Sequence, residues 1–192
     1  MRVVAVNGSP RRDGNTAQLV EAVFEPLRAA GIECEQVPLA GEVVGGCTAC
    51  GVCRKVADRQ CHGRDDFGNK VIAALDAADG IILASPVYFA DVSAELKAII
   101  DRAGYVARGN EGMFVRVPGA GVVTHRRAGA IHALDTINHF FLIGSMIVVG
   151  SSYWNLGVGA ARGDVAADEE GLRTMRTLGE NMAWLLPRVT GE

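Results

Sequence analysis

The sequence predicts an α/β fold, a three-layer sandwich in which a five-stranded parallel sheet in the order 2-1-3-4-5 carries helices on both faces. First, apolar runs of strand length alternate along the chain with segments whose apolar residues recur at helical spacing. Such alternation is typical of parallel sheets wound with helices. Second, a polar, glycine-containing loop follows the first apolar run, and a Ser-Pro-aromatic segment follows the third. In this strand order both segments leave the sheet at one crevice.

Length and composition exclude several classes of protein. The 192 residues predict one domain over residues 1–192, with a cysteine-rich loop insertion at about 40–64. The net charge of −3 and the absence of a long basic run argue against a nucleic-acid partner. No apolar run is long enough to cross a membrane, and the N-terminus resembles no signal peptide, so we expect no membrane partner and a cytoplasmic location.

The elements of the first half follow from apolar spacing and end signals. They are a strand at 3–6, a helix from about Thr16 to Gly31, a strand at 33–39, a helix after Asp65 and Asp66, and a strand at 81–84. Between the second strand and the next helix, residues 40–64 show no apolar period. So long an irregular segment in a compact protein is usually functional. Pro26 is expected to kink the first helix.

The second half continues the alternation. We expect a helix capped by Ser93 or Asp91, a connecting segment at 103–117, a strand at 119–124, a helix over 131–141, a strand at 146–149, and a last helix that begins at Asp168 and ends at Pro187.

The loop after the first strand predicts a phosphate site. A helix N-terminus directs free N–H groups at this loop, and Ser9, Arg11, Asn15 and Thr16 add hydroxyl, guanidinium and amide donors. Neither the P-loop pattern nor the dinucleotide fingerprint is present. A terminal phosphomonoester therefore fits the loop best. The alternative is a solvated turn in which Asn15 or Thr16 caps the helix.

The loops after the third and fourth strands predict a site for a flat ring. Tyr88 and Phe89 are placed to flank an isoalloxazine, and the backbone at 86–88 to bond its pyrimidine edge. Thr124 and His125 leave the fourth strand toward the same side, where their donors would meet a flavin or a nicotinamide phosphate. Alternatively, the aromatic pair only covers the end of the sheet, and the residues after the fourth strand are solvated loop residues.

Taken together, these motifs resemble a known family. The segments Asn7-Gly8-Ser9-Pro10-Arg11, Gly14-Asn15-Thr16 and Ser85-Pro86-Val87-Tyr88-Phe89, followed by Ser93, Leu96-Lys97 and Asp101-Arg102, resemble the NADPH-dependent FMN reductase family of flavodoxin-like proteins. The resemblance implies that FMN binds non-covalently, its phosphate held by Ser9, Arg11, Asn15 and Thr16 and its ring by Pro86, Val87, Tyr88 and Phe89. It also implies a homodimer or homotetramer with the flavin near a subunit interface, and electrons from NAD(P)H or a ferredoxin-like donor.

Four cysteines predict a metal site. Cys47, Cys50, Cys53 and Cys61 form C-x2-C-x2-C-x7-C, and thiolates at steps of three suit a cuboidal cluster. The segment resembles the iron–sulfur flavoprotein branch of the family, which binds a [4Fe–4S] cluster with such a set, usually with a shorter last gap. The alternatives are a zinc site, a Cys47–Cys50 dithiol, and thiols without metal. Cys34 is expected to be a buried thiol outside the site.

The sequence therefore predicts an FMN-dependent oxidoreductase or electron-transfer flavoprotein, in which a cluster relays single electrons between the flavin and a protein partner. FMN would carry the chemistry, and no side chain is assigned a catalytic role. The alternatives are an NAD(P)H-dependent FMN or quinone reductase without a cluster, and a non-catalytic flavodoxin-like module that holds zinc.

Overall fold

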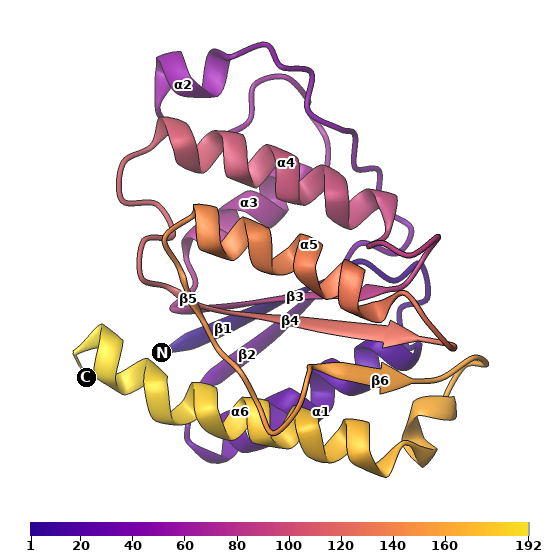
Figure 1. Ribbon diagram of the computed structural model, residues 1–192. Helices are drawn as coiled ribbons and strands as arrows, with labels where there is room; N and C mark the ends of the chain where they lie inside the picture. Colours follow the sequence, from indigo (N-terminus) through magenta and orange to yellow (C-terminus); the bar gives the residue numbers. More distant parts are fainter. Residues whose placement is uncertain (192) are drawn as a thin grey trace.

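The computed structural model describes residues 1–191, and a parallel sheet lies at its centre (Figure 1). The strand order β2-β1-β3-β4-β5 confirms the predicted order. The strands are β1 (Arg2–Asn7), β2 (Glu33–Pro38), β3 (Gly80–Pro86), β4 (Pro118–His125), β5 (Ile147–Val148) and β6 (Leu156–Val158).

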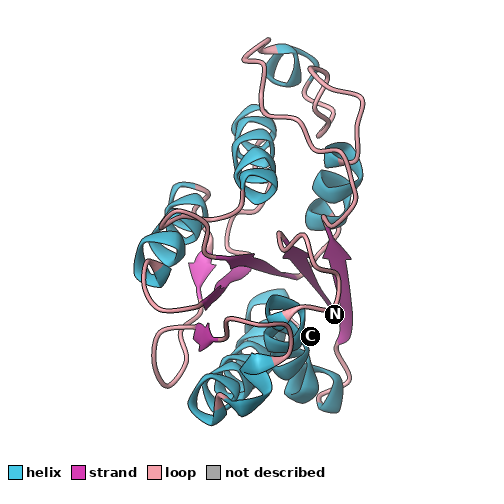
Figure 2. Cartoon of the chain, turned by 90° about the vertical axis from the view of Figure 1, so that its right-hand side faces the viewer, coloured by secondary structure: helices cyan, strands magenta, loops and turns pink. Residues whose placement is uncertain are grey.

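Helices cover both faces of this sheet (Figures 1 and 2). On one face lie α3 (Gly68–Asp76), α4 (Ala94–Gly109) and α5 (Ala130–Ile143), with the short α2 (Val52–Val56) beyond α4. On the other face lie α1 (Asn15–Ala29), the 3-10 helix η1 (Asp164–Ala167) and α6 (Glu169–Thr190). Within the described residues no helix is long and apolar enough to cross a membrane.

Each face of the sheet has its own hydrophobic core. In β1, Val4 and Val6 pack into the core beneath α3, α4 and α5, whereas Val3 and Ala5 pack into the core against α1 and α6. The side chains alternate because successive residues of a strand point to opposite faces. A strand buried on both faces reads as a continuous apolar run, which explains why these strands are visible in the sequence.

The edge beside β4 differs from the prediction. Instead of one strand at 146–149, two short segments occupy this edge: β5 pairs with Pro118 and Gly119, and β6 pairs with residues 123–125. The sequence indicated no strand at β6, because three residues that include Gly157 give no readable period. The glycine is needed there, since a Cβ at Gly157 would lie 2.5 Å from Leu19 Cδ1 of α1.

Two helix ends also correct the prediction. Residues 103–109 continue α4 rather than forming a connection, and α6 runs through Pro187 to Thr190. The α4 pattern was hidden because Arg102, a charged residue, lies on its buried face. Pro26 lies inside α1, within the predicted helix, and α1 continues to Ala29.

Helices α4 and α6 are capped at their N-termini as predicted. Ser93 Oγ accepts a hydrogen bond from Leu96 N (3.3 Å), and an Asp168 carboxylate oxygen accepts one from Gly171 N (3.0 Å). Gly8 lets the end of β1 approach the first of these caps, because a Cβ there would lie 2.7 Å from Ser93 Oγ. The start of α4 is thereby fixed against the loop that leaves β1.

Candidate functional site

A cleft of about 150 Å³ opens at the carboxyl ends of β1, β3 and β4, and we call it the strand-end cleft. Of the ten residues predicted for the FMN site, all except Phe89 line it. The lining residues are Ser9, Arg11, Asn15, Thr16, Pro86, Val87, Tyr88, Thr124, His125, Arg126, Gly159 and Ala160. Sequence analysis missed Gly159 and Ala160, whose only signal was the glycine-rich stretch before the last helix.

The N-terminus of α1 faces this cleft with its donors open. The N-cap is Gly14, so neither Asn15 nor Thr16 caps the helix, and the first turn contains no acidic residue. Thr16 lies at the floor, where its hydroxyl is 3.0 Å from that of Thr124. An uncapped helix N-terminus offers unpaired N–H groups and a positive dipole end to an anion.

Arginine side chains add positive charge at the mouth of the cleft. Arg11 lines it and forms no ion pair within the described chain, whereas its neighbour Arg12 pairs with Glu42 at 3.6 Å. The Arg11 backbone is fixed, since its N–H donates to Ser9 Oγ (3.2 Å). The charge of Arg11 is therefore available to a ligand and that of Arg12 is already partnered.

Asn15 has a structural task that the sequence did not indicate. Its Nδ2 donates to the carbonyl of Ala161 (2.8 Å), and its Oδ1 accepts from the backbone N–H of Gly163 (2.8 Å). The side chain thus ties the segment after β6 to the first turn of α1. Both the oxygen and the nitrogen of its amide are therefore already hydrogen-bonded to the backbone of this segment.

The loop after β3 is a tight turn. The backbone N–H of Val87 donates to the carbonyl of Thr124 and that of Tyr88 to the carbonyl of Asp91, each at 2.8 Å. These two N–H groups are therefore already bonded within the protein, and the prediction that the backbone at 86–88 bonds the pyrimidine edge of a ring stays a prediction for its other groups. Backbone donors from this loop would have to come from Phe89 and Ala90.

The two aromatic residues on this loop differ in their position relative to the cleft. Tyr88 lines the cleft with 46% of its surface exposed, whereas Phe89 is fully exposed and lies outside the lining. Phe89 and Ala90 have φ values of 47° and 67°, in the left-handed region that side chains disfavour. Such strain in a loop beside a cleft is a common feature of functional sites.

One buried polar atom in the cleft has no partner. His125 Nδ1 is shielded from solvent and forms no hydrogen bond among the described residues. Buried polar atoms are nearly always bonded, so an orphan in the wall of a cleft indicates a place for a ligand atom.

The four predicted cysteine ligands surround a second, smaller cavity, which we call the cysteine cavity. Cys53 and Cys61 are buried, and Cys47 and Cys50 are exposed. The cavity is completed by Thr48, Ala49, Gly51, His62, Gly63, Arg102, Tyr105 and Val106. Within the described chain, no three His, Cys, Asp or Glu side chains are grouped so as to hold a single metal ion.

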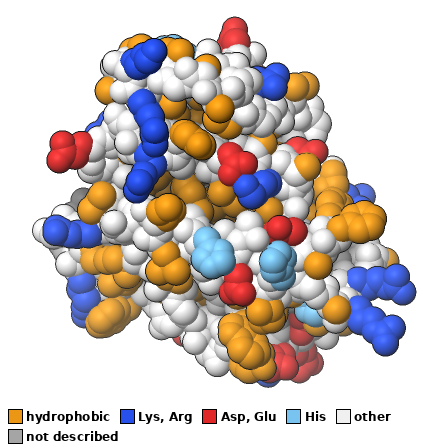
Figure 3. All heavy atoms as spheres, turned by 45° about the horizontal axis from the view of Figure 1, so that its top comes forward, with side chains coloured by type: hydrophobic (Ala, Val, Ile, Leu, Met, Phe, Trp, Pro, Cys, Tyr) orange, Lys and Arg blue, Asp and Glu red, His pale blue; other side chains and the backbone are white. Residues whose placement is uncertain are grey.

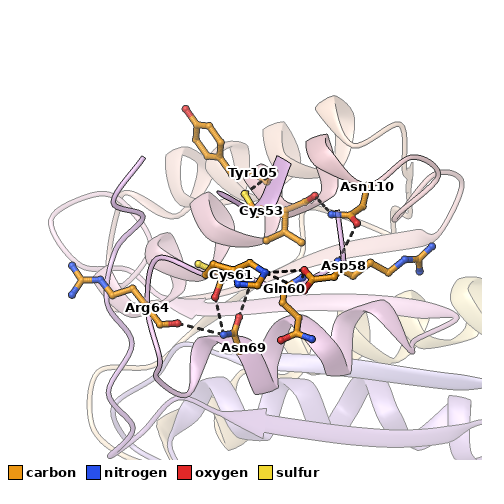
Figure 4. A network of polar contacts seen from close by, with 11 residues as sticks. Cys53, Asp58, Gln60, Cys61, Arg64, Asn69, Tyr105 and Asn110 are labelled. Atoms are coloured by element: carbon orange, nitrogen blue, oxygen red, sulfur yellow. Dashed lines mark hydrogen bonds and ion pairs between the residues drawn. The ribbon is translucent and has the colours of Figure 1, made fainter. Parts of the chain in front are cut away.

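Side-chain hydrogen bonds hold the irregular cysteine segment in place (Figure 4). Asn69 binds both backbone groups of Cys61: its Oδ1 accepts from Cys61 N and its Nδ2 donates to Cys61 O, each at 2.9 Å. Cys53 Sγ lies 3.7 Å from the carbonyl of Tyr105. Asn110 Oδ1 accepts from the N–H of Arg59 (3.0 Å). Cys53 lies within α2, and these contacts hold the chain that follows it so that Cys61 returns to the cavity.

The thiols differ in acidity. Hydrogen bonds from the Val52 backbone and from Thr48 lower the pKa of Cys50. Burial raises the pKa of Cys53, and the neighbouring cysteines, Cys61 foremost, raise it further. Cys34, outside the cavity, has a pKa raised to about 11 by burial, consistent with an inert thiol.

A groove of about 580 Å³ runs between α4 and α5, on the face shown in Figure 3. Basic and aromatic side chains mix along it. They include Arg54, Lys97, Tyr105, Arg108 and His139. Tyr105 also lines the cysteine cavity, so the two hollows are neighbours.

Comparison with solved structures defines the class of protein. RosB, solved with 8-demethyl-8-formylriboflavin 5′-phosphate bound, superposes with a TM-score of 0.78 at 15% identity and covers 100% of this chain and 81% of its own. A flavodoxin from the domain Archaea gives 0.62 at 14% identity, covering 97% and 99%. At such identities the likeness concerns the fold alone, and the fold is flavodoxin-like.

Sequence comparison gives the particular family. The family model for NADPH-dependent FMN reductase matches residues 1–161. An iron–sulfur flavoprotein of Methanocaldococcus jannaschii is 39% identical, covering 95% of this chain and 96% of its own, and one of Archaeoglobus fulgidus is 30% identical, covering 98% and 99%. The chain therefore belongs to the NADPH-dependent FMN reductase family, in its iron–sulfur flavoprotein branch, and is an FMN-dependent oxidoreductase.

Proposed function

We propose that this protein is an electron-transfer flavoprotein that binds FMN in the strand-end cleft and a [4Fe–4S] cluster on Cys47, Cys50, Cys53 and Cys61. Bound FMN would supply hydride acceptance and single-electron transfer, and the cluster would supply single-electron relay. The protein's own residues position the two groups. We assign no general acid, general base or nucleophile.

The observation that supports the FMN site is the uncapped N-terminus of α1, which opens into the cleft beside Arg11. Backbone N–H groups of the first turn, Ser9 Oγ and the Arg11 guanidinium would bind the phosphate. The cleft is smaller than the roughly 300–1,000 Å³ that encloses most organic ligands. It would therefore hold the phosphate and sugar chain, while the ring lies at the rim beside Tyr88 and His125.

The arrangement of donors supports the cluster. Four thiols, of which two are buried, border one cavity, and Asn69 fixes the residue that follows the long gap. The C-x2-C-x2-C spacing is that of cluster-binding proteins.

We further propose that electrons enter from NAD(P)H or a ferredoxin-like donor, and that the protein is a homodimer or homotetramer. A ring at the rim of an open cleft would be shielded by a second subunit, which the fully exposed Phe89 would contact. Sedimentation or light scattering tests the assembly, and Phe89→Asp should reduce the association if this loop lies in the interface.

Anaerobic purification followed by absorption spectroscopy and assays for FMN, iron, sulfide and zinc tests the proposal. We expect one FMN and about four irons and four sulfides per chain, as a [4Fe–4S] cluster requires. Oxidation of NAD(P)H or of a reduced ferredoxin in the presence of an acceptor then identifies the donor.

The other outcomes have definite meanings. Flavin without iron would contradict the cluster and leave an NAD(P)H-dependent FMN or quinone reductase. A colourless chain with bound zinc would contradict both cofactors and favour a non-catalytic flavodoxin-like module.

A further inference from the structure

Arg102 is a fully buried cation in the wall of the cysteine cavity. It lies in the middle of α4, and its Nη1 donates to an Asp66 carboxylate oxygen (2.5 Å) and to the carbonyl of Gly45 (3.2 Å). The other two nitrogens, Nε and Nη2, are also buried, and they have no hydrogen-bond partner among the described residues. Of the three guanidinium nitrogens, only Nη1 is therefore hydrogen-bonded among the described residues.

The surroundings fix this side chain in one position. A Cβ at Gly68 would lie 2.3 Å from Arg102 Nη1, so only a glycine leaves room at the start of α3. The Asp66 carboxylate is held in turn by the backbone N–H groups of Gly45 (2.8 Å) and Gly68 (2.9 Å). The pair links α4, the start of α3 and the chain that leads into the cysteines.

The guanidinium stays charged in this position. It pairs with the Asp66 carboxylate, and an arginine guanidinium remains protonated in proteins. Leaving two donors of a buried cation unbonded is costly, and such groups are normally satisfied by a protein atom, a water or a ligand. Since Arg102 lines the cavity that the four thiols border, the partner that fits is an electron-rich sulfur.

We propose that Arg102 is a positioning and tuning residue for the cluster, whose Nε and Nη2 donate to sulfur atoms within the cysteine cavity and raise the reduction potential. This inference rests on the proposed function. Cluster potentials depend on net charge and on hydrogen bonds to the sulfurs. A fixed cation beside the cluster favours the reduced form, because reduction adds a negative charge. Arg102 would make the cluster easier to reduce than an apolar wall would.

The test uses a variant that removes both charges of the pair, since removing Arg102 alone would leave the buried Asp66 carboxylate without its partner. The double variant Arg102→Gln with Asp66→Asn removes both charges and keeps hydrogen-bonding groups at both positions. The single variant Asp66→Asn removes only the negative charge behind Arg102. The matched control is Arg64→Gln: Arg64 Nε also bonds a carbonyl of the cysteine segment, that of Gly46 (3.2 Å), but the side chain is exposed.

The readouts are FMN, iron and sulfide per chain and the cluster midpoint potential, measured by an anaerobic redox titration followed by electron paramagnetic resonance. In the double variant we expect the potential to fall by about 59 mV or more, a tenfold change in the one-electron equilibrium. Asp66→Asn should raise the potential, and Arg64→Gln should leave it unchanged. The FMN content should stay constant, which reports an intact fold.

A merely structural role would lower the iron content and leave the potential of the loaded fraction unchanged, and that result would overturn the inference. If the double variant holds no iron, the potential of Arg102→Lys is compared with that of the unaltered chain. Lysine keeps the charge but loses the forked donors, so a lower potential supports the inference and an unchanged potential overturns it. Iron absent from the unaltered chain would instead overturn the proposed function, and this inference with it.

Discussion

The strand-end cleft and the cysteine cavity are built by different means. The cleft is formed by the ends of three hydrogen-bonded strands and the first turn of a long helix, so backbone pairing fixes its shape. The cysteine cavity is formed by a segment whose only regular element is the five-residue α2. That segment is held by a few side chains on or next to the helices α3 and α4, chiefly Asp66, Asn69, Arg102 and Asn110.

This difference predicts different responses to damage. A substitution in the cleft should weaken one ligand contact while the sheet keeps its shape. A substitution in the cysteine segment should abolish binding of the proposed cluster and leave the rest of the molecule intact, because few contacts of this segment reach the sheet. Helix α4 joins the two regions: Ser93 at its start packs against the end of β1, and Arg102 lies further along it beside the cysteines.

The largest expected effect is that of Cys53→Ala. Removing one buried ligand should abolish iron binding while FMN stays bound at full stoichiometry, because the cleft does not depend on the cysteine segment. Iron, sulfide and flavin assays on anaerobically purified protein measure both. Cys34→Ala, which removes a half-buried thiol outside the cavity, is the control and should change neither. Loss of FMN together with iron would show that the two regions are not independent.

Arg11→Ala should weaken FMN binding. Hydrogen bonds to charged groups contribute about 1.5–3 kcal/mol, so the Kd should rise about 10- to 150-fold. Fluorescence titration of FMN-free protein measures it. Arg12→Ala removes the adjacent arginine, which pairs with Glu42 instead of lining the cleft, and should leave the Kd nearly unchanged. Equal effects of the two variants would mean that only long-range charge attracts the phosphate.

Asn15→Ala should act on stability first. The backbone N–H of Gly163 and the carbonyl of Ala161 lose their partner, which should lower the free energy of unfolding by about 1–3 kcal/mol. Denaturant unfolding without FMN measures it. Asn15→Asp, which keeps the acceptor for Gly163, should lose less. An unchanged stability with a large loss of FMN affinity would instead make Asn15 a direct phosphate ligand.

The smallest effects concern the aromatic pair. Tyr88→Ala should weaken FMN binding by about 0.5–1.5 kcal/mol, the contribution of an aromatic pair. Phe89→Ala should alter the free energies of binding and unfolding by less than about 0.5 kcal/mol, as an exposed side chain does. Both are measured on dilute protein, where a subunit interface would not contribute. A larger effect for Phe89 would mean that the loop closes over the ring.

The sequence by itself determined the order of the five strands β1 to β5, though not β6, and the chain segments that form both regions. Strands β1 and β3 are buried on both faces and are therefore continuous apolar runs, and the loops that follow them carry recognisable donors and aromatics. The four cysteines needed only their spacing to be recognised. These signals are local, since each lies within a few residues of chain.

The tertiary structure alone decided which side chains are free to act. Asn15 lies among the predicted phosphate donors, yet its amide binds Gly163, 148 residues away. Arg102 looks like the charged end of a helix pattern, yet it is buried against Asp66, 36 residues earlier in the chain. Such assignments depend on contacts between distant segments, and a buried polar group must find its partner wherever the fold places one.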